Sequence, residues 1–178
     1  MAQRSSTNRA TSDDYEDVEG FAVAVVHEDT TWKCTPLSAA ALSSLSTAED
    51  ELRALRSTGA VFGLLDVDDE FFIVLRPGPT GSRLLISDAT AAIDYDIAVD
   101  VLEALNLEVP DIDPDELDDI EPWEEGDLGV LADLGLPEPV LSVILTETDL
   151  YPDEQLGMVA QRLGFADEFS AALDKLHR

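Results

Sequence analysis

The chain has 178 residues and carries 39 acidic against 10 basic side chains, which gives a formal net charge of −29 at pH 7. This charge opposes direct binding to nucleic acids and to anionic membranes, because both need cationic side chains that displace counterions. A hydrophobic content of 45% excludes a wholly disordered acidic protein. The length suits one ordinary domain, with or without a small appendage.

The single cysteine, Cys34, excludes an intramolecular disulfide and favours a reducing compartment. Residues 1–20 contain no apolar run typical of a signal peptide, and no stretch approaches the roughly 18 apolar residues of a membrane span. We therefore predict a cytoplasmic protein in which residues 1–19 form a disordered tail.

Regular structure is expected to begin at Phe21, where the continuous apolar run FAVAVVHED is typical of a strand buried on both faces. The following TTWKC segment can turn back as a short antiparallel partner. A helix over residues 48–56 is predicted next, with Thr47 as its N-cap and Gly59 at its end.

Three more short apolar runs, VFGLLDV, EFFIVLR and RLLIS, are separated by polar turns and predict an antiparallel meander. A helix is expected after Ser87 and Asp88, because apolar residues recur from Ile93 to Leu105 at helical spacing. Residues 20–107 are therefore predicted to form an α+β domain, with an antiparallel sheet of about five strands and two helices.

Residues 108–127, called the acidic segment below, contain 11 acidic residues, no basic ones and three prolines. This composition predicts a solvated linker. Four short amphipathic runs follow, over residues 126–136, 137–147, 151–165 and 166–176. They predict a small all-helical C-terminal subdomain over residues 128–178.

Few residues are suited to metal or nucleophilic chemistry. One cysteine and two histidines, His27 and His177, offer no zinc-site spacing. Cys34 and His27 could meet across the predicted hairpin, but no third residue orients them, so a structural thiol and a strand histidine are the simpler interpretation. The glycines of PGPTGS lie between strands and do not precede a helix, so they form no phosphate-binding loop.

A calcium loop is also excluded. Asp111, Asp113 and Asp115 alternate like the first ligands of an EF-hand, but Glu116 replaces the required glycine and Pro122 the bidentate glutamate. We therefore predict no metal, no cofactor and no catalytic residue.

The distribution of charge favours a basic protein as partner. The 78 residues from Leu84 to Gln161 include 22 acids and neither lysine nor arginine. Such a field would steer positively charged surfaces toward the chain. Solubility and adaptation to high salt are the competing explanations.

Two blocks have residue sequences more specific than a strand or a helix alone would require: LLISDATAAIDYDIAVDVLEAL (84–105) and DLYPDEQLGMVAQRLGF (149–165). Together with FAVAVVHED, they resemble the tRNA adenosine deaminase-associated proteins of actinobacteria, over about residues 20 to 177. The family name implies proximity to that enzyme. The chain itself lacks the zinc deaminase signature, which requires H-x-E and two cysteines.

We therefore predict a non-catalytic accessory protein that contacts the tRNA adenosine deaminase or another basic protein. An acidic nucleic-acid mimic that inhibits a basic protein is one alternative, and a carboxylate-dependent enzyme acting around Asp88 to Asp96 is another. The oligomeric state is left open. The candidate contact residues are Asp88, Asp94, Tyr95, Asp96, Tyr151, Asp153, Glu154 and Arg162.

Overall fold

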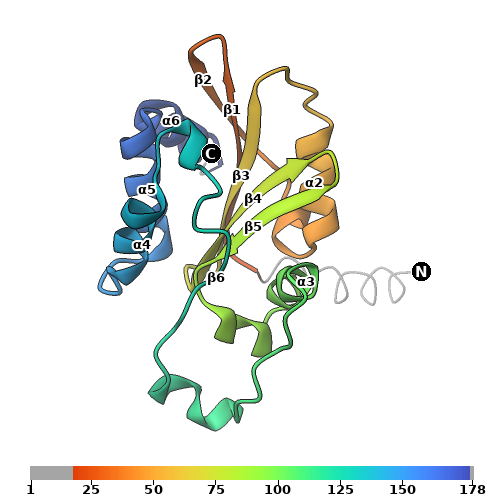
Figure 1. The fold of residues 1–178 in the computed structure, drawn as a ribbon, viewed down its shortest axis with the longest axis vertical. Coiled ribbons are helices and arrows are strands. Elements are labelled where there is room, and N and C mark those ends of the chain that lie inside the picture. The colour runs from red at the N-terminus through yellow and green to blue at the C-terminus, as the bar shows by residue number, and fades with distance from the viewer. Residues whose placement is uncertain (1–17, 177–178) are drawn as a thin grey trace, which may run out of the picture.

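The computed structural model describes residues 18–176 and is built around a six-stranded antiparallel sheet of order β2-β1-β3-β4-β5-β6 (Figure 1). The predicted α+β class is confirmed, with one strand more than expected. Residues 1–17 of the predicted tail (1–19) lie outside the described residues, and Glu19 is bonded to Asp68, whose N–H donates to the Glu19 carbonyl at 2.6 Å. The strands are β1 (Gly20–Glu28), β2 (Thr31–Pro36), β3 (Ala60–Val67), β4 (Phe71–Gly78), β5 (Gly81–Ile86) and β6 (Glu125–Gly126).

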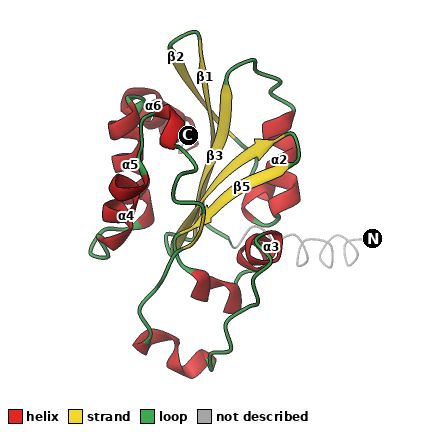
Figure 2. Ribbon diagram, in the orientation of Figure 1, coloured by secondary structure: helices red, strands yellow, loops and turns green. Residues whose placement is uncertain are grey.

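Helices cover both faces of the sheet (Figure 2). The first face carries α2 (Leu45–Arg53) and α3 (Asp96–Ala104), and the second carries α4 (Glu138–Thr146), α5 (Pro152–Leu163) and α6 (Ala166–Leu176). The short 3-10 helices are η1 (Ala39–Leu42), η2 (Ala89–Ile93), η3 (Pro114–Asp119) and η4 (Ala132–Leu134). Among the described residues, no helix is long and apolar enough to cross a membrane.

Alternation along each strand divides the buried side chains between two cores. In β1, Ala22 and Ala24 enter the core beneath α2 and α3, whereas Phe21, Val23 and Val25 enter the core beneath α4 to α6. Successive side chains of a strand point to opposite faces, so a strand covered on both sides must be apolar throughout. The C-terminal helices therefore supply the second covering layer that the continuous apolar run requires.

Aromatic side chains join the C-terminal helices to the sheet. Phe165, between α5 and α6, is fully buried, with ring centroids 4.8 Å from Trp32 of β2 and 6.1 Å from Phe62 of β3. Phe169 of α6 contacts Phe21 of β1 at 5.7 Å, edge to face. Such contacts add to the hydrophobic gain from burial, and they fix α6 over the β1 and β2 strands.

Two arginines tie the sheet to the chain that leads into the C-terminal helices. Arg76 of β4 makes a two-pronged ion pair with Asp133, at 2.6 and 2.9 Å, and donates to the Val130 carbonyl at 2.9 Å. Arg83 of β5 donates to Asp127 at 2.7 Å. The Arg76 side chain is 16% exposed and that of Asp133 is 57% exposed, so water reaches the pair from its acidic side and screens it.

Two helix boundaries differ from the prediction. Ser44 caps α2 in place of Thr47, its hydroxyl accepting from the Thr47 amide, and the helix ends at Arg53, well before Gly59. The helix predicted after Asp88 is two elements, η2 and α3, which are separated where Tyr95 adopts an extended backbone. Asp88 does cap η2, because its carboxylate accepts from the backbone N–H of Thr90 at 2.9 Å.

The acidic segment has more structure than a solvated linker. It contains η3, which buries none of its residues, and it ends in β6, which pairs with β5. The helix predicted over residues 126–136 is wrong, since only η4 forms there. A strand of two residues leaves no periodic signal in the sequence, so its pairing could not be predicted.

Candidate contact surface at one end of the sheet

The β3–β4 turn lies at the centre of the candidate surface. Asp68 and Asp69 adopt the left-handed conformation, with φ of 60° and 56°, which aspartate tolerates better than most residues. Asp66, the preceding inward residue, accepts the Asp69 N–H through Oδ1 at 2.9 Å. This bond fixes the turn and aims its carboxylates in two directions.

Tyr95 joins the turn from the first face of the sheet. Its hydroxyl donates to Asp68 Oδ2 at 2.7 Å, and its ring lies 5.2 Å from that of Phe71. Burial raises the pKa of Tyr95, and the hydrogen bond to the Asp68 carboxylate raises it further, so the phenol keeps its proton. The junction between η2 and α3 is thereby anchored to the turn.

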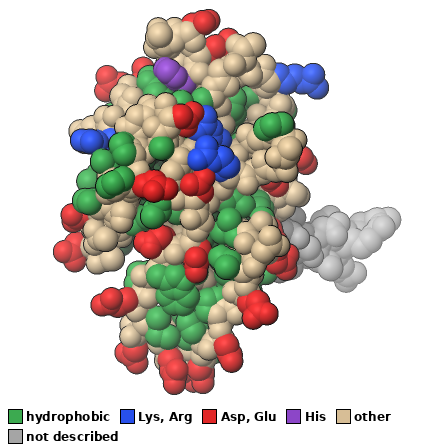
Figure 3. Space-filling model, viewed as in Figure 1, with side chains coloured by type: hydrophobic (Ala, Val, Ile, Leu, Met, Phe, Trp, Pro, Cys, Tyr) green, Lys and Arg blue, Asp and Glu red, His purple; other side chains and the backbone are tan. Residues whose placement is uncertain are grey.

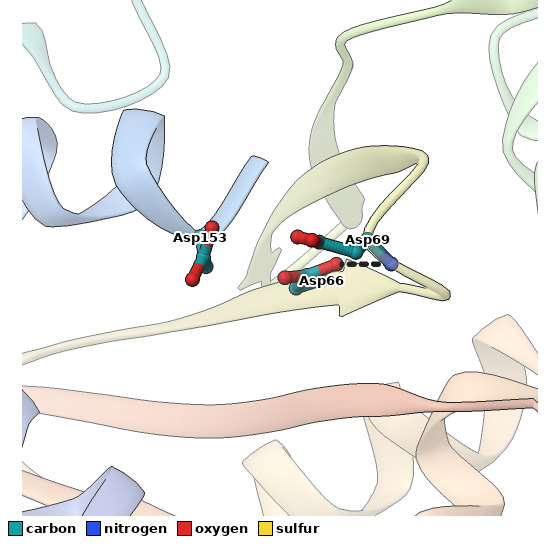
Figure 4. A group of neighbouring side chains, drawn as sticks. All are labelled: Asp66, Asp69 and Asp153. Carbon is teal, nitrogen blue, oxygen red and sulfur yellow. Dashed lines mark hydrogen bonds between the residues drawn. The ribbon is translucent and has the colours of Figure 1, made fainter. Parts of the chain in front are cut away.

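Asp153 reaches the same turn from the second face, in the first turn of α5 (Figure 4). Carboxylate oxygens of Asp66, Asp69 and Asp153 all lie within 4.8 Å of one another. Asp66 is 2% exposed, and its burial, reinforced by repulsion from Asp69, raises its pKa to about 7. Burial and the Asp69 charge also raise the pKa of Asp153. The two distinctive sequence blocks therefore meet at one turn.

This trio is the group of described side chains best suited to a cation. Its three carboxylates are the hard oxygen donors that Mg²⁺ and Ca²⁺ prefer. Asp66, however, is already used to hold the turn, and its raised pKa allows the trio to keep a proton that relieves the repulsion. Sequence reasoning missed the group because Asp153 is distant along the chain, and only the run DVDD hinted at it.

A hollow of about 160 Å³ lies beside the turn, between η2 and η3. A smaller one of about 100 Å³ shares Glu70 and Asp88 with it and extends to Pro152 and Gln155 of α5. No described basic side chain lines either hollow. The larger hollow combines apolar walls (Phe71, Ala91, Leu117 and Ile120) with the carboxylates of Glu70, Asp88, Asp94 and Asp118.

Most of the predicted contact residues from the first block are at this end of the sheet. Asp88, Asp94 and Tyr95 line the larger hollow, and Asp96 is exposed at the start of α3. Of these four, Asp88 and Tyr95 have local structural tasks in capping η2 and bonding Asp68. Asp94 and Asp96 are exposed.

The predicted residues of the second block are divided. Asp153 belongs to the carboxylate trio, and Glu154 accepts the Tyr151 N–H at 3.0 Å, which caps α5. Tyr151 is 62% exposed. Arg162 lies near the other end of α5, about 15 Å along the helix axis, and forms no ion pair within the described part of the chain. The structure therefore does not bring Arg162 to the candidate surface.

The cysteine–histidine pair considered above does not form. The hairpin register places Cys34 opposite Val25 and His27 opposite Trp32, on which the imidazole stacks at 4.1 Å. Burial, and then the charge of Glu168, raise the pKa of Cys34 to about 12. The thiol is therefore protonated at neutral pH and unsuited to nucleophilic attack.

The opposite end of the sheet carries basic side chains where the β3–β4 turn carries acidic ones. A hollow of about 430 Å³ lies there, at the start of β3 and the end of β4, and its lining includes Arg53, Arg56 and Arg76 but no acidic residue. The guanidinium of Arg76 is engaged by Asp133, and that of Arg53 donates to the Gly78 carbonyl at 3.0 Å. The arginines thus gather away from the β3–β4 turn.

Comparison with known proteins assigns a family. The model of a family described as "Rv3753c-like tRNA adenosine deaminase-associated protein" matches residues 20–166. The protein Rv3753c of Mycobacterium tuberculosis (strain ATCC 25618 / H37Rv) is 60% identical over 177 residues, which cover 99% of this chain and 99% of that protein. No solved structure matches the chain.

Proposed function

Because this chain belongs to the family of Rv3753c-like tRNA adenosine deaminase-associated proteins, we propose that it is a non-catalytic accessory protein that acts by contact with the deaminase or another basic protein. The family description names an association with a deaminase and does not name the protein as the enzyme. A zinc deaminase site would need two cysteines beside its histidine, and this chain has one cysteine.

The observation that carries the proposal is the meeting of the two distinctive blocks at the β3–β4 turn. They come from opposite faces of the sheet and converge on Asp68 and Asp69. The surface around them presents carboxylates with no described lysine or arginine in its hollows. A surface of one sign favours encounter with a partner of the other sign, and tRNA-binding enzymes carry basic surfaces.

The contact would be electrostatically steered, so its salt dependence is part of the proposal. Charges separated by more than a Debye length, about 8 to 10 Å at physiological salt, are screened. A partner held only by that field would therefore leave at moderate salt. A dedicated partner would remain, because it also buries apolar surface.

The proposal is tested with the purified chain and the purified tRNA adenosine deaminase of the same organism. We expect a complex in size-exclusion chromatography at about 50 mM and about 200 mM salt, together with a changed rate of tRNA deamination. Absence of a complex at the lower salt, with an unchanged deamination rate, would contradict the proposal.

Competition separates the accessory role from nucleic-acid mimicry. An acidic mimic occupies the polyanion site of its target, so tRNA and unrelated DNA should both displace it. A dedicated accessory protein should be displaced by few polyanions or none. Displacement of the bound chain by unrelated DNA would favour the mimic.

A further inference from the structure

We infer that the acidic segment is a docking element, whose apolar side chains enter an apolar patch rimmed by lysine and arginine on the partner protein. This inference deepens the proposed function and rests on it. Five large apolar residues recur among the carboxylates of the segment, and none of them belongs to either core. They are Val109, Ile112, Leu117, Ile120 and Trp123.

Two of these side chains are exposed in the folded chain, and the other three are half-buried. Val109 is 41% exposed and Trp123 36% exposed, and η3 buries none of its residues. Figure 3 shows hydrophobic side chains gathered over the lower part of the molecule, where Figure 1 places η3, with carboxylates around their edge. An apolar patch with a polar rim is the usual anatomy of a protein interface.

The segment is held in place by backbone and side-chain hydrogen bonds. The backbone carbonyl of Trp123 accepts from the Ala89 N–H at 2.8 Å, and the indole N–H of Trp123 donates to the Glu125 carboxylate at 3.2 Å. Asp113 caps η3 by accepting the Asp115 N–H at 3.1 Å. These bonds tie the segment to η2 and fix its turn, so less conformational entropy is lost when a partner binds.

Charge decides what can cover this patch. The segment has 11 acidic residues and no basic ones, so docking against the same segment of a second copy would bring two such segments together without a counter-charge. The arginine-lined hollow of a second copy is a poor alternative, because the guanidiniums of Arg53 and Arg76 already bond within their own chain. Anionic lipid would be repelled in the same way. Residues 1–17 carry two arginines and four acids, and so do not complement the segment either. A separate protein with a basic rim is the occupant that both the charge and the apolar surface fit.

The larger hollow specifies one detail of that partner. Leu117 and Ile120 form apolar wall on one side, and Asp88 and Asp94 bring carboxylates to the same space of about 160 Å³. Lysine and arginine side chains combine an aliphatic stem with a cationic head, so one such side chain can satisfy both parts of the hollow. The partner is therefore expected to insert a basic side chain beside η3.

A matched pair of valines tests the apolar part of the inference. Val109→Ser changes the segment, and Val143→Ser makes the same change on α4, where Val143 is 57% exposed. We expect the first variant to bind the deaminase about 5- to 10-fold more weakly in calorimetric titration, and the second to bind as the wild type does. Equal affinities of the two variants would overturn the inference.

Charge-matched variants test the acidic part. Asp111→Asn with Asp119→Asn neutralises two carboxylates of the segment, and Asp167→Asn with Asp174→Asn neutralises two exposed ones on α6. Both double variants change the net charge equally. We expect the first to lower the affinity and to flatten its salt dependence more than the second, and equal effects would count against a local docking surface.

Synthetic peptides test the docking surface without assuming that the deaminase is the partner. A synthetic amphipathic peptide of leucine and lysine should bind the wild-type chain more tightly than a serine-and-lysine peptide of equal charge, and Val109→Ser should remove that difference. Equal binding of the two peptides would overturn the docking inference. If the leucine-and-lysine peptide binds the chain more tightly than the serine-and-lysine peptide but the deaminase does not bind, the docking inference stands and the deaminase is not the partner.

Discussion

The sheet and the acidic segment both contain many large apolar residues, yet only the sheet buries them. Phe62, Phe72 and Leu85 are fully buried in the sheet. In the acidic segment, Val109 is 41% exposed and Trp123 is 36% exposed. The sheet is covered on both faces by helices, whereas the acidic segment follows α3 and contributes no described residue to either core. Apolar content therefore builds the fold in one region and leaves an accessible surface in the other.

Substitution of an aromatic residue in each region should show the largest contrast. Phe165→Ala removes a fully buried ring between Trp32 and Phe62, so we expect a loss of about 3 to 5 kcal/mol in the free energy of unfolding. Trp123→Ala should cost less than about 1 kcal/mol, because that side chain belongs to no core. Urea denaturation measures both, and similar losses would show that the segment is part of the core.

Asp66, the buried carboxyl at the junction of the two blocks, should make the stability of the chain depend on pH. Its pKa of about 7 in the folded chain lies above the ordinary value near 3.9, so folding favours the protonated form. The stability from this group is fully present below about pH 4, and it is lost as the pH rises through about 7. The wild type should therefore be less stable at pH 8 than at pH 5.

Asp66→Asn should remove that dependence, because an amide can still accept the Asp69 N–H without bearing a charge. We expect the stability difference between pH 5 and pH 8 to shrink by on the order of 2 to 4 kcal/mol. Asp118→Asn, an exposed change of equal charge, serves as the control. An unchanged pH profile of the Asp66 variant in urea denaturation would show that Asp66 is ionised throughout.

A smaller effect is expected at the ion pair that joins β4 to the C-terminal layer. Arg76→Met removes the contacts to Asp133 and to the Val130 carbonyl, and should cost about 1 to 2 kcal/mol. Arg162→Met, on the exposed surface of α5, should stay within about 0.5 kcal/mol of the wild type. Equal midpoints in thermal denaturation would show that the pair contributes nothing to the attachment of the second layer.

The smallest effect on stability should come from the variants that most weaken partner binding. Val109→Ser removes a side chain outside both cores, so we expect a change within about 0.5 kcal/mol in the free energy of unfolding. A larger loss, measured by urea denaturation, would show that the apolar side chains of the acidic segment stabilise the fold.

Local patterns predicted the strands well, because burial on both faces leaves an unmistakable run in β1 and in β4. The same runs indicated that a second layer must cover the sheet. They did not indicate that α4 to α6 supply it, since that depends on Phe165 and Phe169 meeting residues more than 100 positions earlier in the chain. Long-range packing of this kind carries no periodic signal.

The candidate surface was predicted in part. The two blocks were recognised in the sequence, and capping by Asp88 follows from its position before η2. The sequence does not indicate that the blocks meet at Asp68 and Asp69, two turn residues with left-handed backbone. Their partners, Tyr95 and Asp153, are distant in the sequence and approach from opposite faces of the sheet. Arg162 does not reach this surface, because about nine residues of helix separate it from Asp153.

The most direct test of the central claim, action through protein contact, is a pull-down of the tagged chain from a lysate of its source organism at about 50 mM and about 200 mM salt, followed by mass spectrometry. We expect the tRNA adenosine deaminase to be enriched at both salt concentrations. Recovery of assorted basic proteins that are lost at the higher salt, without the deaminase, would contradict it.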